Sequence, residues 1–230
     1  MGRELHEARR SDLDCGFAVE PAIFKPSEMA DLTSGLEDVA RSRAGARHLM
    51  TRPGVAQVAN DPRLLMIARR WLGLTAHPYR ATLFDKSSEA NWLVAWHQDR
   101  ALPLLDRLEV PGWGPWSVKA GVLYAHAPAR ALEAVVALRL HLDDSNFANG
   151  PLRVLPGTHQ RGVLTDEAIQ ELARETQPHA CVVGRGGVVA MRPLLVHASS
   201  KSTSEAPRRV LHIEYARSLA QEAGLQLRVA

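Results

Sequence analysis

The segment Trp96-His97-Gln98-Asp99 places a histidine and an aspartate two residues apart at the end of a predicted strand. Side chains at positions i and i+2 of a strand point to the same face, so the imidazole and the carboxylate can converge on one point. A second histidine from a distant strand completes a 2-His-1-carboxylate metal set with open coordination positions. A histidine that caps a strand end before a loop aspartate is the competing interpretation of this pair.

A second histidine occurs in the distal half of the chain. Residues 193–197 form an apolar strand that ends in His197, Ser199 follows, and Arg208 opens a further predicted strand. A hairpin of this length folds Arg208 back beside His197. A buried guanidinium needs an anion, and a carboxylate bound by two N–H groups is its natural partner. With a hydrogen bond from Ser199, this arrangement could hold the remote carboxylate of 2-oxoglutarate while its keto-acid end chelates iron. Strand alternation allows only one of Arg208 and the arginine after it to face inward.

The elements that must position these residues follow from the apolar pattern. Ser27 is the predicted cap of a helix whose apolar residues recur at spacings of three and four as far as Val39. Asp61-Pro62 opens a second helix, and Gly73 ends it. A short helix is expected over 165–175.

From about residue 79 the pattern changes to short apolar segments typical of strands. Residues 101–118 hold three prolines and are predicted to form an ordered loop. Two helices followed by about eight short strands indicate helices packed on a β-barrel or sandwich. The predicted strands are 79–86, 92–97, 135–143, 152–155, 180–183, 187–191, 194–197 and 209–215.

The length of 230 residues fits a single domain. We expect a helical N-terminal part over 1–78, a catalytic core over 79–217 and a C-terminal tail over 218–230. An insert over 101–133 interrupts the core.

Composition restricts the class of partner. The formal charge is +3, but the arginines are scattered, so a solvated basic surface is favoured over a nucleic-acid-binding stripe. An anionic substrate or carrier is the alternative. Cys15 and Cys181 show no paired spacing, which favours a reducing compartment. Residues 1–10 hold no apolar core, and no run of eighteen apolar residues occurs, so we expect a cytoplasmic protein with no signal peptide and no membrane partner. The oligomeric state is left open.

Three stretches resemble the phytanoyl-CoA dioxygenase family of iron(II)/2-oxoglutarate oxygenases. The order and spacing of the His-x-Asp motif, the NGPLRVLPGTH block and the His/Ser/Arg block carry the resemblance, which runs from about residue 83 to 216. The stretches are LFDKSSEANWLVAWHQD, LRLHLDDSNFANGPLRVLPGTHQRG and MRPLLVHASSKSTSEAPRRVLHIEYA.

The resemblance implies a mainly β fold, a double-stranded β-helix (jelly roll) with N-terminal helices packed on it. It implies His97, Asp99 and His197 as ligands of Fe(II), and Arg208 with Ser199 on the C5 carboxylate of 2-oxoglutarate, with O₂ as co-substrate. Related halogenases lose the carboxylate ligand. Asp99 is present, which favours hydroxylation.

Other residues have less defined roles. Lys86 and Asn91 lie in matching stretches, where each could face the cofactor, the substrate or solvent. The insert is the candidate wall of the substrate pocket, because loops on a rigid barrel carry specificity. Ordinary packing around tryptophans is the alternative interpretation of the insert. Its candidate substrate-binding residues are Trp113, Trp116, Tyr124 and His126.

The predicted function is hydroxylation of a small organic substrate, with 2-oxoglutarate decarboxylated to succinate and CO₂. Desaturation or ring formation at the same iron is also compatible with these residues. One rival is a jelly-roll metalloenzyme of the isomerase or hydrolase kind without 2-oxoglutarate. The other is a barrel that binds a small ligand without catalysis.

Overall fold

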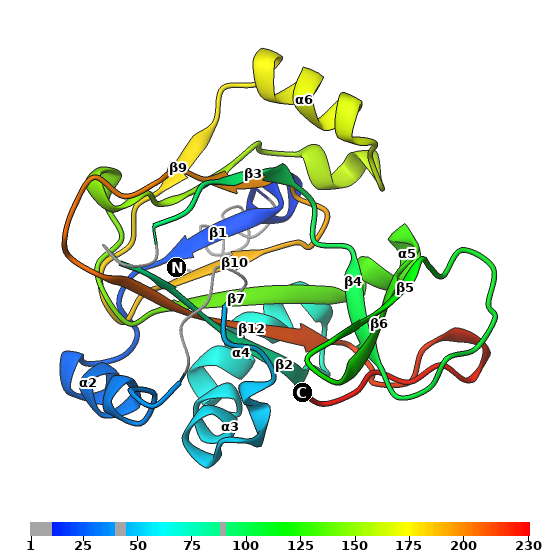
Figure 1. Cartoon of the computed structure of the whole chain (residues 1–230), viewed down its shortest axis with the longest axis horizontal. Helices are drawn as coiled ribbons and strands as arrows, with labels where there is room; N and C mark the ends of the chain where they lie inside the picture. Colours follow the sequence, from blue (N-terminus) through cyan, green and yellow to red (C-terminus); the bar gives the residue numbers. More distant parts are fainter. Residues whose placement is uncertain (1–10, 40–44, 88–90) are drawn as a thin grey trace.

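The computed structural model describes residues 11–39, 45–87 and 91–230, and its core is formed by antiparallel β-sheets with helices on the outside (Figure 1). The largest sheet has five strands in the order β1-β10-β7-β12-β2. Their bounds are β1 Phe17–Glu20, β10 Val188–Met191, β7 Val135–His141, β12 Arg208–Ala216 and β2 His77–Lys86.

Two smaller sheets complete the β structure. The second sheet has the order β3-β11-β8-β9, and the third has the order β4-β6-β5. Their bounds are β3 Val94–His97, β11 His197–Ser199, β8 Leu152–Val154, β9 His179–Cys181, β4 Ala101–Leu104, β6 Val122–His126 and β5 Trp116–Lys119.

Helices cover the outer face of the largest sheet and one end of the molecule. Helix α4 begins as the sequence predicts, since the Asp61 carboxylate accepts a hydrogen bond from the Arg63 backbone N–H at 2.9 Å and Pro62 is the first helical residue. The helices are α2 Pro26–Ser34, α3 Pro53–Ala59, α4 Pro62–Leu72, α5 Ala129–Leu132 and α6 Asp166–Glu175, with 3₁₀ turns η1 Leu49–Thr51, η2 Phe147–Asn149, η3 Thr158–Arg161 and η4 Glu222–Gly224. No helix among the described residues is both long and apolar enough to span a membrane.

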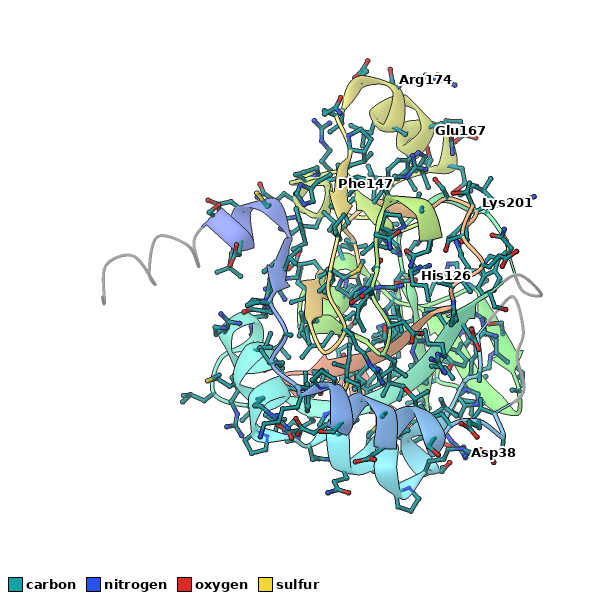
Figure 2. All side chains as sticks on the ribbon, turned by 90° about the vertical axis from the view of Figure 1, so that its left-hand side faces the viewer. Asp38, His126, Phe147, Glu167, Arg174 and Lys201 are labelled. Atoms are coloured by element: carbon teal, nitrogen blue, oxygen red, sulfur yellow. The ribbon has the colours of Figure 1, made fainter. Side chains whose placement is uncertain are left out.

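Figure 2 shows how the helices lie relative to the sheets. Glu167 and Arg174 mark α6 at the top of this view, and Asp38, which follows α2, lies at the bottom. The β structure lies between them, so the N-terminal helices and α6 occupy opposite ends of the molecule.

Strand alternation gives the largest sheet two different faces. Leu211, Ile213 and Tyr215 of β12 are fully buried in the apolar core that the sheet shares with α3 and α4. The alternate residues Arg208 and His212 line a cavity on the other face. The outer face therefore supplies most of the apolar burial, and the inner face is free to carry polar groups.

The structure corrects several expected elements. Residues 101–118 are not only a loop, because they contain β4 and the start of β5, and both pair with β6 further along the chain. Pro103 is compatible with β4 because β4 is an edge strand. Strand β1 and helix α3 were not predicted. Helix α2 stops at Ser34, and residues 194–196 form a turn, so that β11 begins only at His197.

We predict that Leu64→Ala on α4 lowers the free energy of unfolding by about 2–5 kcal/mol, because it leaves a cavity between the helix and the sheet. Leu64 is 0% exposed, whereas Met66 on the same helix is 62% exposed. Met66→Ala is the matched control and should change stability by no more than about 0.5 kcal/mol. Urea denaturation measures both values, and equal effects would contradict the packing of α4 on the sheet.

Candidate active site

Three potential metal ligands converge where β3 ends and β11 begins. His97 and His197 are direct partners in the antiparallel pairing of these strands. Asp99 follows β3, and its carboxylate oxygens lie 3.8 Å from His97 Nε2 and 3.6 Å from His197 Nε2. One ligand atom from each residue lies within 4.8 Å of the others. Among the described residues this is the one group of three or more such side chains that could hold a metal ion.

The same local contact orients both imidazoles. His97 Nδ1 lies 2.8 Å from the carbonyl oxygen of Ala95, and His197 Nδ1 lies 2.8 Å from that of Leu195. A ring nitrogen that faces a carbonyl carries the proton, so each Nε2 keeps its lone pair for a metal. The backbone N–H of Asp99 donates to the Pro193 carbonyl at 2.9 Å and fixes the third ligand.

Burial and the neighbouring His97 lower the pKa of His197, so its ring is neutral at neutral pH. A neutral imidazole beside a carboxylate is the protonation state that metal binding requires. The donor set and its protonation therefore fit a divalent transition-metal ion.

A cationic cluster lies deeper in the same cavity. Lys86 and Arg208 are direct partners in the pairing of β2 with β12, and both side chains are buried. Lys86 Nζ donates to Ser199 Oγ at 2.8 Å and also to the carbonyl oxygen of Ser200. Arg208 donates from Nη2 to Ser199 Oγ at 3.3 Å and from Nε to the Asn149 carbonyl at 3.1 Å.

One donor of this cluster has no partner. Arg208 Nη1 is buried and makes no hydrogen bond within the part of the chain that the structure describes. Burial, with the nearby charges of Arg208 and Arg139, lowers the pKa of Lys86 to about 7. Burial and Arg139 lower the pKa of Arg208 to about 10. The electrostatics are those of a site built to receive an anion.

The adjacent arginine faces the other way. Arg209 donates from Nε and Nη2 to the two carboxylate oxygens of Asp143, both at 2.7 Å. It does not line the cavity, so strand alternation assigns the inward position to Arg208.

The cavity that joins the ligand set to the cationic cluster has a volume of about 450 Å³. Its lining includes two carboxylates, those of Asp99 and Asp166, and seven cationic side chains. The cationic residues are Arg47, Arg80, Lys86, Arg100, Lys119, Arg139 and Arg208.

The insert supplies part of the cavity wall. Tyr124 and His126 of β6 line it, as the sequence predicted for the substrate side. Trp113 and Trp116 do not. The Trp113 indole N–H donates to Glu222 Oε1 at 2.7 Å, and the Trp116 ring packs under Arg107. Trp113 therefore joins the insert to the C-terminal segment and Trp116 packs within the insert, which is the packing role that competed with substrate binding.

Asn91 is also placed away from the cavity. Its side-chain amide donates to the Ser202 carbonyl at 2.8 Å, and its side-chain oxygen accepts from the Ser202 backbone N–H at 2.7 Å. Both polar atoms of the amide are thus used to join two loops, and the cavity lining does not include the residue. The structure gives Asn91 no contact with the proposed cofactor site.

Gln98 and Arg139 are among the cavity residues that the sequence did not assign to the site. Gln98 is the middle residue of the His-x-Asp motif, and its side chain bonds to the carbonyls of Gly162 and Leu194 and to the N–H of Leu164, at 2.9, 2.7 and 2.9 Å. It thereby ties the ligand strand to the segment before β11. Arg139 lies on the inner face of β7, and its charge inside an otherwise apolar strand was the signal that could have identified it.

Comparison with known proteins gives a family match and two relatives of known activity. The family profile of phytanoyl-CoA dioxygenase matches residues 14–210. The chain is 25% identical over 188 residues to L-proline trans-4-hydroxylase of Streptomyces griseoviridis, a match that covers 70% of this chain and 62% of the relative. It is 26% identical over 164 residues to ectoine dioxygenase of Bordetella parapertussis, with 64% and 46% covered. The chain thus spans less than two thirds of the length of either relative.

The fold is shared with a solved structure. The crystal structure of EctD from S. alaskensis with 2-oxoglutarate and 5-hydroxyectoine superimposes with a TM-score of 0.69 at 20% identity. The match covers 91% of this chain and 75% of that one. The jelly-roll fold predicted from the sequence is confirmed.

We predict that the wild-type protein binds about one Co(II) or Fe(II) ion per chain and that His197→Ala weakens this affinity roughly 100-fold or more, because one of three protein ligands is lost. Anaerobic equilibrium dialysis measures the affinity. His126 lines the same cavity but lies outside the ligand set, so His126→Ala is the matched control and should bind metal like the wild type. Unchanged binding in His197→Ala would exclude this ligand set.

Proposed function

We propose that this chain, which belongs to the phytanoyl-CoA dioxygenase family, is an iron(II)- and 2-oxoglutarate-dependent oxygenase that hydroxylates a small organic substrate. One observation carries the proposal: a 2-His-1-carboxylate set and a buried guanidinium with an unpartnered donor share one cavity. The names of the relatives, a proline hydroxylase and an ectoine dioxygenase, support small-molecule hydroxylation. Neither a nucleic acid nor a membrane is proposed as a partner, and the expected cytoplasmic location stays a prediction.

His97, Asp99 and His197 are the residues that would hold iron(II). Two imidazole nitrogens and one carboxylate leave positions open for a chelating 2-oxo acid and O₂. The hydrogen bonds from the two Nδ1 atoms to backbone carbonyls set the ring orientation before metal binds.

Arg208, Ser199 and Lys86 would bind the C5 carboxylate of 2-oxoglutarate. The unpartnered Nη1 of Arg208 and the ammonium of Lys86 can each donate to one carboxylate, and such charge-assisted bonds are the stronger class. When bound, iron(II) and 2-oxoglutarate would activate O₂, with one oxygen atom going into a substrate C–H bond as a hydroxyl and the other into succinate as CO₂ is released.

The remaining cavity residues orient the substrate and exclude water. Tyr124 is almost fully buried, and its hydroxyl lies 2.9 Å from His48 Nε2. Burial raises the pKa of Tyr124, so the phenol stays protonated. Together with His126 it forms a polar wall on the insert side of the cavity. We assign the substrate to this side, because the opposite end is taken up by the Arg208 cluster.

Anaerobic titration of the iron(II)-loaded protein with 2-oxoglutarate should produce the weak visible metal-to-ligand charge-transfer band. We predict that Arg208→Ala weakens 2-oxoglutarate binding about 10- to 100-fold, because a charge-assisted hydrogen bond contributes about 1.5–3 kcal/mol. Arg209→Ala is the matched control, since Arg209 faces Asp143 outside the cavity, and it should titrate like the wild type.

The same titration separates the rival functions. A metalloisomerase or hydrolase would bind iron without forming the band, and a non-catalytic barrel would not need iron at all. Absence of the band in folded, iron-loaded wild-type protein would therefore contradict the proposed function.

Affinity for 2-oxoglutarate should fall as the pH rises above about 7. The pKa of Lys86 is lowered to about 7, so below this pH the ammonium is already charged, and above it anion binding must take up a proton. The expected loss is up to about tenfold per pH unit. Lys86→Met should bind 2-oxoglutarate more weakly at pH 6, and its affinity should not change with pH. Lys119→Met, on β5, should keep the pH dependence of the wild type. A slope that persists in Lys86→Met would assign it to another group.

A further inference from the structure

Positive charge in the cavity exceeds what the proposed cofactors can neutralise. Seven cationic side chains and two carboxylates line it. Iron(II) and 2-oxoglutarate carry opposite and equal charges, so the excess is the same after both are bound. Buried charges without partners are costly, which indicates that a further anion belongs in this cavity.

Arg139 is a buried cation of the cavity that no proposed cofactor contact uses. Its side chain is 8% exposed and lines the cavity from β7. Nη1 lies 3.2 Å from His212 Nδ1, and the guanidinium carbon lies 5.4 Å from the centre of the Phe84 ring. Nε is buried and has no hydrogen-bond partner among the described residues.

No carboxylate of the described residues forms an ion pair with Arg139, although the charge of Asp99 acts on it through space. His212 Nε2 lies 3.8 Å from Glu214 Oε1, and Glu214 forms an ion pair with Arg80. The Glu214 carboxylate is therefore paired with Arg80 and reaches Arg139 only through the His212 ring. An added anion at Arg139 would complete the network.

The position of Arg139 distinguishes it from the 2-oxoglutarate end of the cavity. Arg139 pairs with His212, four residues along β12 from Arg208, so the backbone positions of His212 and Arg208 are about 13 Å apart at a strand rise of about 3.3 Å per residue. The Arg139 guanidinium faces His212, although its charge is near enough to lower the pKa of Arg208. Further along the network, the Arg80 guanidinium carbon lies 5.6 Å from the centre of the Tyr124 ring, on the insert side.

We propose that the substrate is an organic acid and that Arg139 binds its carboxylate beside His212. This inference rests on the proposed function and narrows its substrate class. A guanidinium presents two parallel donors to a carboxylate, so it fixes the orientation of the acid as well as its presence. The cavity of about 450 Å³ must hold cofactor and substrate together, which selects a small acid or the acidic end of a larger one.

Matched acids and amides test the charge requirement. The probes are L-proline, L-valine, benzoate and hexanoate with their primary amides, titrated by calorimetry into the anaerobic iron(II)–2-oxoglutarate form. At least one acid should bind tenfold or more tightly than its amide. Arg139→Met should remove this preference, and Arg139→Lys should restore part of it. The proposal is overturned if no acid binds more tightly than its amide, or if Arg139→Met keeps the preference.

The 2-oxoglutarate titration separates failure of this inference from failure of the proposed function. In Arg139→Met the charge-transfer band should appear with wild-type affinity, because the Arg208 end is intact. Loss of the band in this folded variant alone would place Arg139 in the cofactor site and overturn the inference. A wild-type protein without the band would instead refute the proposed function. Arg153→Gln, on β8 over the Trp96 ring and outside the cavity, is the control and should behave like the wild type in both titrations.

Discussion

Positive charge buried inside a β-sandwich is the constraint on which the rest of the structure depends. Lys86, Arg139 and Arg208 are each at most 8% exposed, and the described residues offer them hydroxyls, carbonyls and an imidazole rather than carboxylates. Burying a charge without a counterion costs several kcal/mol. Anions that bind in the cavity would offset this unfavourable free energy, because ligands that bind only the folded state stabilise that state. The inner face should therefore be more stable with anions bound than without them.

In the largest sheet, the residues that stabilise the fold and the residues that line the cavity lie on opposite faces. Strands β2, β7 and β12 send apolar side chains outward into the core shared with α3 and α4 and cationic side chains inward to the cavity. The short apolar segments are visible in the sequence, and they predicted most strands and a barrel or sandwich, while the family resemblance implied the jelly roll. The pairing of β4 and β5 was not predictable in the same way, because residues 101–118 carry prolines and glycines whose edge-strand role depends on β6.

The candidate site also contains features that the sequence predicted and features that it did not. Spacing predicted that His97 and Asp99 converge, and the family resemblance added His197, which the structure places opposite His97 in the pairing of β3 with β11. Roles that depend on side-chain contacts were less accessible: Trp113 and Asn91 lie in the expected segments but bond to distant loop residues. Arg139 was missed because its neighbours are apolar, and a strand pattern does not reveal which alternate face opens onto a cavity.

Within one cavity, the contacts assign different tasks to groups of similar chemistry. The ligand histidines are oriented by carbonyls two residues earlier in the chain, so their orientation is set locally. The cations, in contrast, come from β2, β7 and β12 and are held by few hydrogen bonds. Local fixation suits a metal site, which needs one geometry. In the proposed assignment Arg208 binds the co-substrate and Arg139 the substrate, so a change at Arg139 would alter substrate choice while the metal ligands stay the same.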